Sequence, residues 1–184
     1  MLPHFGDLPV CIEDGSTFRE NAVKKAVHYS QDFAGRVFAD DSGLIVDALG
    51  GAPGIFSARY AGPNASDEEN NQRLLEELHG AEASAGDLTS SPAEARVPPH
   101  RAAHYECVIA LAESGRLVLT VEGRADGVII DHPRGRGGFG YDPYFYYPPL
   151  DKTFAEISAE EKFAVSHRGA AFRRLLDELA RHIT

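Results

Sequence analysis

The chain has few of the features that mark secreted or membrane proteins. Its 184 residues include only two cysteines, Cys11 and Cys107, too few for a disulfide framework or a CxxC metal site. We expect two buried or half-buried free thiols. No apolar run approaches the roughly 18 residues of a membrane helix, and residues 1–7 have neither the basic start nor the apolar stretch of a signal peptide. These absences predict a cytoplasmic protein without a membrane partner.

Positive charge is also scarce. The chain has 18 Lys and Arg against 28 Asp and Glu, a formal net charge of −10. Because affinity for nucleic acid comes mainly from basic side chains that neutralise phosphates, we expect no nucleic-acid partner. The 43% of hydrophobic residues is enough to build the core of one folded domain.

Three capping signatures predict where helices begin. TFRE at 17–20 has the S/T-x-x-E form, and the apolar spacing after it predicts a helix over 18–32. SDEE at 66–69 predicts a second helix that ends at His79-Gly80, since glycine commonly follows a helix. SAEE at 158–161 predicts a third. A last helix is expected to place one apolar stripe in the core, made of Phe172, Leu175, Leu176, Leu179 and Ile183.

Short apolar runs between these helices predict strands. We expect a strand at 37–39, an acidic turn at 40–43 and a second strand at 44–46. Further strands are expected at 105–112, 117–121 and 128–130, the first two joined by a hairpin turn at 113–116. Residues 81–99 are rich in Ala, Ser, Pro and Glu and predict a flexible insertion. The order of elements favours an α/β fold, a mixed β-sheet flanked by helices.

Carboxylates around the first helix are candidates for metal chemistry. Asp40 and Asp41 are adjacent, and successive side chains of a strand point to opposite faces, so at most one should act on a given ligand. Glu13 and Asp14 could join it. Hard oxygen ligands of this kind suit Mg²⁺, which takes one or two carboxylates together with substrate phosphates. A solvated turn and a capped loop remain as alternatives.

Two later segments suit a flat ligand with negative charge. Residues 135–140 read GRGGFG, but the prolines that follow stop a helix, so we reject a dinucleotide-binding loop. The loop instead surrounds one ring, Phe139, on which a planar ligand could stack; burial of Phe139 in the core is the alternative. Lys162, Ser166, His167 and Arg168 gather near a helix junction, where solvated charges are the alternative.

Taken together, these segments resemble the inosine triphosphate pyrophosphatase (Ham1-like) family. The motifs that carry the resemblance are TFRENA at 17–22, DDSGL at 40–44, GGAPGIFSARY at 50–60, GFGYDP at 138–143, EK at 161–162 and SHR at 166–168. They span nearly the whole chain outside 81–99. The resemblance implies a single domain over 1–184, with two lobes and a nucleotide-binding cleft between them.

The resemblance also implies a function: hydrolysis of ITP, dITP and XTP to the monophosphate and pyrophosphate by a Mg²⁺-dependent, usually homodimeric enzyme. By position, Glu13 and Asp41 would hold the metal, and Asp41 would also be the general base. Lys25 and Ser42 would contact the phosphates or ribose, and Phe139 would stack on the purine. The other implied substrate-binding residues are Gly140, Tyr141, Asp142, Lys162, His167 and Arg168, the last four reading the base and its 6-keto edge.

The sequence departs from the family pattern in three places. Members usually carry an early strand and a Thr-Gly-Asn-x-x-Lys loop that holds the triphosphate, and this sequence begins, at Met1, beyond the place of that segment. A weakened or non-catalytic purine-nucleotide binder is therefore the alternative function. The other departures are Phe163, where Asn is usual, and the insertion at 81–99.

Overall fold

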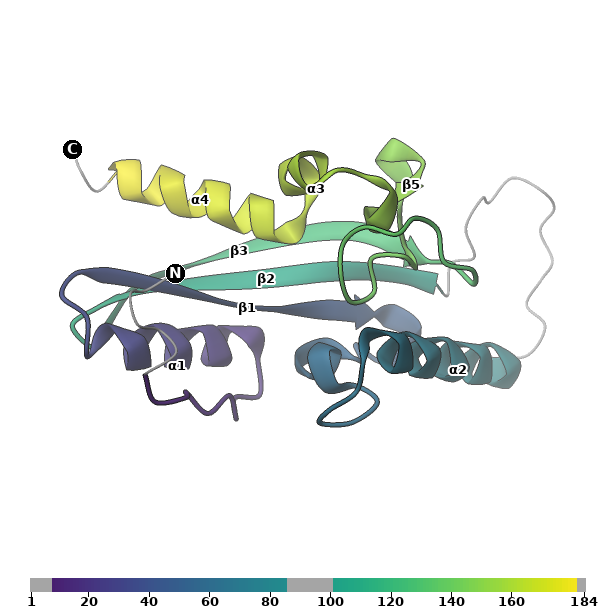
Figure 1. Ribbon diagram of the computed structural model, residues 1–184, viewed down its shortest axis with the longest axis horizontal. Coiled ribbons are helices and arrows are strands. Elements are labelled where there is room, and N and C mark those ends of the chain that lie inside the picture. The colour runs from purple at the N-terminus through teal and green to yellow at the C-terminus, as the bar shows by residue number, and fades with distance from the viewer. Residues whose placement is uncertain (1–7, 86–100, 182–184) are drawn as a thin grey trace.

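The computed structural model describes residues 8–85 and 101–181, and every structural statement below concerns these two ranges. Five strands and four α-helices follow one another along the chain (Figure 1). Their bounds are α1 (Phe18–Ser30), β1 (Arg36–Val46), α2 (Asp67–Ala85), β2 (Ala102–Glu113), β3 (Arg116–Ile129), β4 (Phe145–Tyr147), β5 (Lys152–Thr153), α3 (Ala159–Val165) and α4 (His167–Arg181). None of these helices has the length and apolarity to cross a membrane.

The strands form one sheet in the order β1-β2-β3-β4-β5. The α/β class with flanking helices is confirmed, but all four strand pairs of the described residues are antiparallel rather than mixed. The tight turn between β2 and β3 explains this for the central pair, because two residues can connect only antiparallel neighbours. Ser114 and Gly115 both have positive φ there, as a two-residue hairpin turn requires, so the expected hairpin is confirmed.

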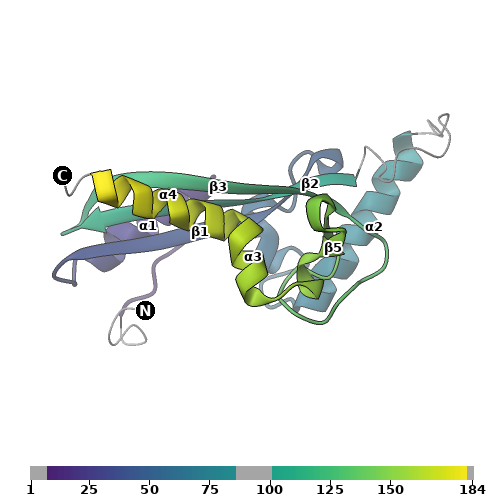
Figure 2. The same cartoon turned by 90° about the horizontal axis from the view of Figure 1, so that it is seen from above.

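Helices cover both faces of the central strands. Alternate residues of β2 pack against α1 on one face and α4 on the other, which explains why its sequence is apolar almost throughout. Figure 1 shows α1 and α2 on one side of the sheet and α3 and α4 on the other, and Figure 2 shows α4 running along the sheet. A third cluster joins α2 to β1 and β4 through Leu74, Leu78, Leu44, Val46 and Phe145.

Two predicted breaks between strands are wrong. The expected acidic turn at 40–43 lies inside β1, where these residues pair in register with residues 106–109 of β2. The ladder of cross-strand hydrogen bonds therefore overrides the local turn preference of Asp-Asp-Ser-Gly. The expected strands at 117–121 and 128–130 belong to one strand, β3, which ends one residue earlier, at Ile129. Gly123 and Gly127 look like breaks in the sequence but leave room for neighbouring elements.

The helix starts are confirmed and one helix end is wrong. Thr17 and Ser158 accept hydrogen bonds from the backbone N–H groups of Glu20 and Glu161, as the capping signatures predict. α2 continues through Gly80 to Ala85, so 81–85 are helical, while 86–99 of the expected insertion lie outside the described residues. Glycine ends a helix only where the backbone turns left-handed, and here it does not.

The core-facing stripe of α4 is narrower than predicted. Leu175 is buried, and Phe172 and Leu179 pack against its cluster, but Leu176 is 51% exposed. Leu176 follows Leu175 directly, so the two side chains point about 100° apart around the helix. Ile183 lies outside the described residues. Cys11 is partly buried and Cys107 is buried, and both are free thiols, as expected.

Substitution of two glycines by alanine should have opposite effects on stability. A Cβ atom at Gly123 would overlap His167 O and Ala171 N of the α4 backbone, so Gly123→Ala should lower the free energy of unfolding by about 1–3 kcal/mol. Gly80 is exposed within α2 with no atom near its Cβ position, so Gly80→Ala should raise it by about 0.5–1 kcal/mol. Urea unfolding measures both; equal effects would contradict the packing of α4 on β3.

Candidate functional site

β1 carries two adjacent aspartates to opposite faces of the sheet. Asp41 faces α1, where it accepts hydrogen bonds from Lys25 Nζ at 2.9 Å and Asn21 Nδ2 at 3.2 Å. Asp40 faces α4, where its Oδ2 accepts a hydrogen bond from Arg168 Nε at 3.1 Å. Successive side chains along a strand point to opposite faces, so the two carboxylates were expected not to face the same ligand, and they do not.

Lys25 brings Glu13 and Asp41 to one point. Its Nζ donates to Glu13 Oε2 and to Asp41 Oδ1, both at 2.9 Å. Burial raises the pKa of Asp41, and the hydrogen bond and charge of Lys25 oppose that rise only in part. Burial alone would lower the pKa of Lys25, but its bonds to the two carboxylates outweigh burial and raise it. The three groups therefore form a tightly coupled charged cluster at the loop before α1.

This cluster fits a hard divalent cation. The carboxylate oxygens of Glu13 and Asp41 converge on one cationic atom, Lys25 Nζ. Mg²⁺ binds carboxylate oxygens of this kind, and water and phosphate oxygens complete its coordination shell. Across residues 8–85 and 101–181, no three His, Cys, Asp or Glu side chains are grouped to hold a metal by themselves. A cation here would therefore depend on ligand oxygens as well as on Glu13 and Asp41.

A cleft of about 160 Å³ opens beside Ser42, the residue of β1 that follows Asp41. All of the predicted substrate-binding residues line it except Lys25, which lies with Glu13 and Asp41 on the α1 side of the strand. The cleft thus brings β1, the loop at 138–142, α3 and α4 together. Its other lining residues are Gly43, Ser57, Ala58, Asp67, Asn70 and Tyr105.

Phe139 presents its ring to this cleft rather than to the core. The residue is 59% exposed, so the alternative of a core position is wrong. Lys162 Nζ lies 4.3 Å and Arg168 Cζ 5.4 Å from the ring centroid, distances typical of cation–π contacts. The backbone N–H of Phe139 and Lys162 Nζ both donate to the buried Asp142 Oδ2. Asp142 therefore fixes the loop and Lys162 together.

Sequence reasoning missed the residues of α2 that hold this loop. Asp67 Oδ2 accepts from Gly140 N at 2.6 Å, and Asn71 Nδ2 donates to Gly140 O at 3.0 Å. Asn71 is buried and lies on the same helix face as Leu74, Leu75 and Leu78. The sequence does contain a signal for Asn71, because a polar residue on an otherwise apolar helix face often has a specific hydrogen-bonding role. Tyr141 also anchors the loop, since its hydroxyl donates to Ser57 O at 2.8 Å.

His167 is a neutral imidazole at the base of the cleft. The residue is 5% exposed, and its ring stacks on Tyr105 with 4.6 Å between ring centroids. Burial, with smaller contributions from Arg168 and Lys162, lowers its pKa from 6.5 to about 3. Within the described part of the chain, His167 Nδ1 is buried and has no hydrogen-bond partner. A polar ligand group in the cleft could supply that partner.

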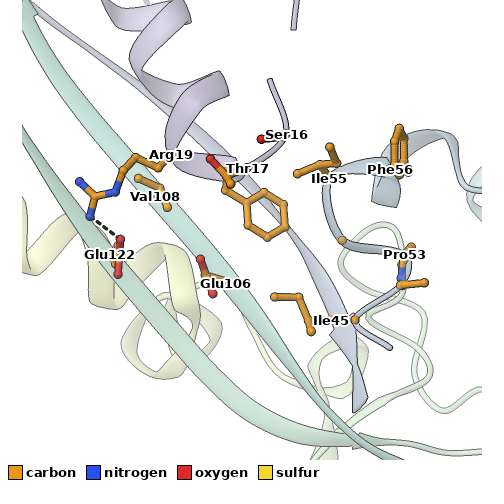
Figure 3. Close-up of a pocket in the computed structure, with 14 residues that line it drawn as sticks. Ser16, Thr17, Arg19, Ile45, Pro53, Ile55, Phe56, Glu106, Val108 and Glu122 are labelled. Atoms are coloured by element: carbon orange, nitrogen blue, oxygen red, sulfur yellow. Dashed lines mark hydrogen bonds and ion pairs between the residues drawn. The ribbon is translucent and has the colours of Figure 1, made fainter. Parts of the chain in front are cut away.

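A larger hollow of about 670 Å³ lies between the start of α1 and the 3₁₀ helix Gly54–Arg59, and it contains none of the predicted site residues. Figure 3 shows Ile45 and Val108 on the sheet, Ile55 and Phe56 on the facing segment, and an ion pair between Arg19 and Glu122 at one side. Its lining is mainly apolar, and of its three charged residues, Arg19, Glu106 and Glu122, the first and last pair with each other, so it lacks the group of cations found in the smaller cleft. The smaller cleft is therefore the candidate active site.

The architecture and the cleft together define an α/β protein whose cleft brings two cations to one exposed aromatic ring. The family model described as the Ham1 family matches residues 1–178, and the chain belongs to the Ham1 family. This confirms the resemblance drawn from the sequence motifs.

Named relatives and solved structures agree with this assignment. The dITP/XTP pyrophosphatase of Desulfotalea psychrophila is 49% identical over 96% of this chain and 72% of its own length. That of Geobacter sulfurreducens is 48% identical over 97% of this chain and 82% of its own. A HAM1 protein from Coxiella burnetii matches with a TM-score of 0.81 and 43% identity, over 95% of this chain and 82% of its own. The Staphylococcus aureus Ham1 protein has a TM-score of 0.81 and 40% identity, over 97% and 84%.

The buried neutral His167 should make stability depend on pH. Between pH 6.5 and about 3 the unfolded chain binds this proton and the folded chain does not, so lowering the pH through that range favours unfolding. His167→Gln should therefore reduce the loss of stability on acidification by up to about 1.4 kcal/mol per pH unit. Urea unfolding at pH 5, 6 and 7 measures the difference, with the exposed His132→Gln as control. Parallel pH profiles for wild type and His167→Gln would contradict a neutral His167.

Proposed function

We propose that this chain hydrolyses dITP, XTP and ITP to the corresponding monophosphate and pyrophosphate. The observation that carries the proposal is the cleft, where an exposed Phe139 with two cations adjoins the strand that bears Asp41 and Ser42. The relatives named dITP/XTP pyrophosphatases, 49% and 48% identical, support the same substrates.

The end of the cleft around Phe139 suits a purine with a keto group. The ring would stack on Phe139, and the donors of Lys162 and Arg168 would face the 6-keto oxygen. The neutral His167 would add a hydrogen bond to the base edge. An amino group in place of the keto oxygen would leave these donors unpaired, which costs free energy in a closed site and favours ITP over ATP.

The cluster of Glu13, Lys25 and Asp41 on the α1 side of β1 suits the triphosphate. We propose that Glu13 and Asp41 hold Mg²⁺, which when bound neutralises phosphate charge and acidifies water. Asp41 would take the proton of the water that adds across the α–β phosphoanhydride bond, as a general base whose carboxylate Lys25 and Asn21 hold in place. Lys25 and the Ser42 hydroxyl contact the phosphates or ribose, and the Lys25 charge favours the pyrophosphate leaving group.

We further propose a homodimer that acts in the cytoplasm. The family resemblance supports the homodimer, and a substrate drawn from the nucleotide pool supports the cytoplasmic location. The net charge of −10 favours a small-molecule nucleotide over nucleic acid as the partner.

Replacing Asp41 should abolish turnover. With dITP and Mg²⁺, Asp41→Asn should release pyrophosphate at least about 100-fold more slowly than wild type, because an amide can neither accept the water proton nor hold the cation as well. Asp126→Asn makes the same change of charge on β3, where Asp126 pairs only with Arg124 among the described salt bridges, and should keep wild-type rates. Pyrophosphate release that survives Asp41→Asn would remove Asp41 from its proposed role.

The metal proposal predicts a shifted dependence on Mg²⁺. Chelation with EDTA should stop pyrophosphate release, and added Mg²⁺ should restore it. Glu13→Gln should raise the Mg²⁺ concentration for half-maximal rate by about tenfold or more, since one charged oxygen ligand is lost. Asp14→Asn is the matched control, because Asp14 contacts Lys24 rather than Lys25. An unchanged Mg²⁺ requirement in Glu13→Gln would exclude Glu13 as a ligand.

A further inference from the structure

Asp40 has no part in the chemistry proposed above, yet it is bonded into the wall of the cleft. Its Oδ2 accepts from Arg168 Nε at 3.1 Å and lies 3.9 Å from Cys107 Sγ. Burial, with the charge of Asp40 adding to it, raises the pKa of the Cys107 thiol to about 12, so the thiol keeps its proton and faces the carboxylate as a weak donor. Asp40 is thus held between a buried thiol and an arginine of the cleft.

The bond to Asp40 uses one specific edge of the Arg168 guanidinium. Among the described residues, Arg168 donates one side-chain hydrogen bond, from its Nε to the carboxylate of Asp40. The two terminal nitrogens are left for a ligand, while Cζ lies 5.4 Å from the Phe139 ring centroid. The guanidinium is planar, so the direction of its hydrogen bonds depends on the orientation of its plane. The bond from Nε to Asp40 restrains that orientation.

Each of the two cations near the Phe139 ring is paired with a carboxylate. Lys162 is paired with Asp142, and Arg168 is paired with Asp40. Each carboxylate offsets the repulsion between two positive charges that approach one aromatic ring. Removal of either carboxylate would let its cation move away from the ring.

We propose that Asp40 is a positioning residue for base recognition, acting through Arg168. This inference rests on the proposed function of the cleft. The consecutive residues Asp40 and Asp41 then serve the two ends of one nucleotide, Asp40 the base and Asp41 the phosphates, because the pleat of β1 points them to opposite faces. Ser42, the next residue, lines the cleft.

The variant that tests this should remain folded. The side chains of Asp40 and Arg168 are 38% and 46% exposed, and exposed ion pairs contribute little to stability. Asp40→Asn keeps the shape of the side chain and removes its charge. Asp126→Asn makes the same change at an exposed pair with Arg124 on β3, outside the cleft, and is the matched control.

Asp40→Asn should weaken base recognition without stopping the reaction. We expect KM for dITP and Kd for IMP to rise about threefold to tenfold, with kcat within about twofold of wild type. The preference for ITP over ATP in kcat/KM should fall by a similar factor, since the keto group is read less well. Asp41→Asn should show the reverse pattern, a loss of kcat. Steady-state kinetics and calorimetric titration with IMP measure these quantities.

A double-mutant cycle separates positioning from a general structural effect. In an Arg168→Ala background, Asp40→Asn should raise Kd for IMP no further, because the residue through which it acts is gone. A full additional rise in that background, or an equal rise with Asp126→Asn, would overturn the proposal. So would a kcat loss like that of Asp41→Asn.

The two proposals can fail separately. Wild-type protein that binds IMP but releases no pyrophosphate would overturn the proposed hydrolysis. The role of Asp40 would then be tested by comparing the Kd for IMP of wild type and Asp40→Asn. Equal Kd for IMP in wild type and Asp40→Asn would overturn the role of Asp40 alone. Wild-type protein that neither binds IMP nor releases pyrophosphate would overturn both.

Discussion

The pairing of β1 with β2 is the constraint on which the site depends. Residues 36–46 stay in register with β2 through the whole acidic segment, so Asp40, Asp41 and Ser42 take alternating directions. A turn at this point would have let both carboxylates face the same solvent. Because β2 is buried on both faces, its partner strand is held firmly, and the spacing between the Lys25 cluster and the Phe139 cleft is set by backbone geometry.

The aromatic loop depends on packing in a different way. Residues 138–142 form no regular element, so their backbone groups need partners from elsewhere. Asp67 and Asn71 of α2 supply two of them, and Asp142 supplies one from within the loop. The position of Phe139 is therefore set by a helix whose own place comes from the apolar cluster around Leu74 and Leu78.

Local signals in the sequence were sufficient for the helix starts, whereas the predicted cleft residues came from the family motifs, and Asp67 and Asn70 of the cleft lining were missed. Capping by Thr17 and Ser158 involves residues three apart, so the sequence alone predicts it. The continuity of β1 could not be predicted, because Asp-Asp-Ser-Gly favours a turn and its pairing partner lies more than sixty residues away. The bonds between α2 and Gly140 join positions 69 residues apart or more, and no spacing rule connects them.

Charge pairing explains how an acidic chain can keep three cations at the proposed nucleotide site. Lys162 and Arg168 at the cleft, and Lys25 on the α1 side of β1, each have a carboxylate partner that holds them in place. Lys25 in turn offsets the repulsion between Glu13 and Asp41, so two negative groups stay together before any ligand arrives. Such preorganised charges need little rearrangement when phosphates enter. The net charge of −10 therefore describes the surface as a whole, while the arrangement of paired ions decides what the cleft can bind.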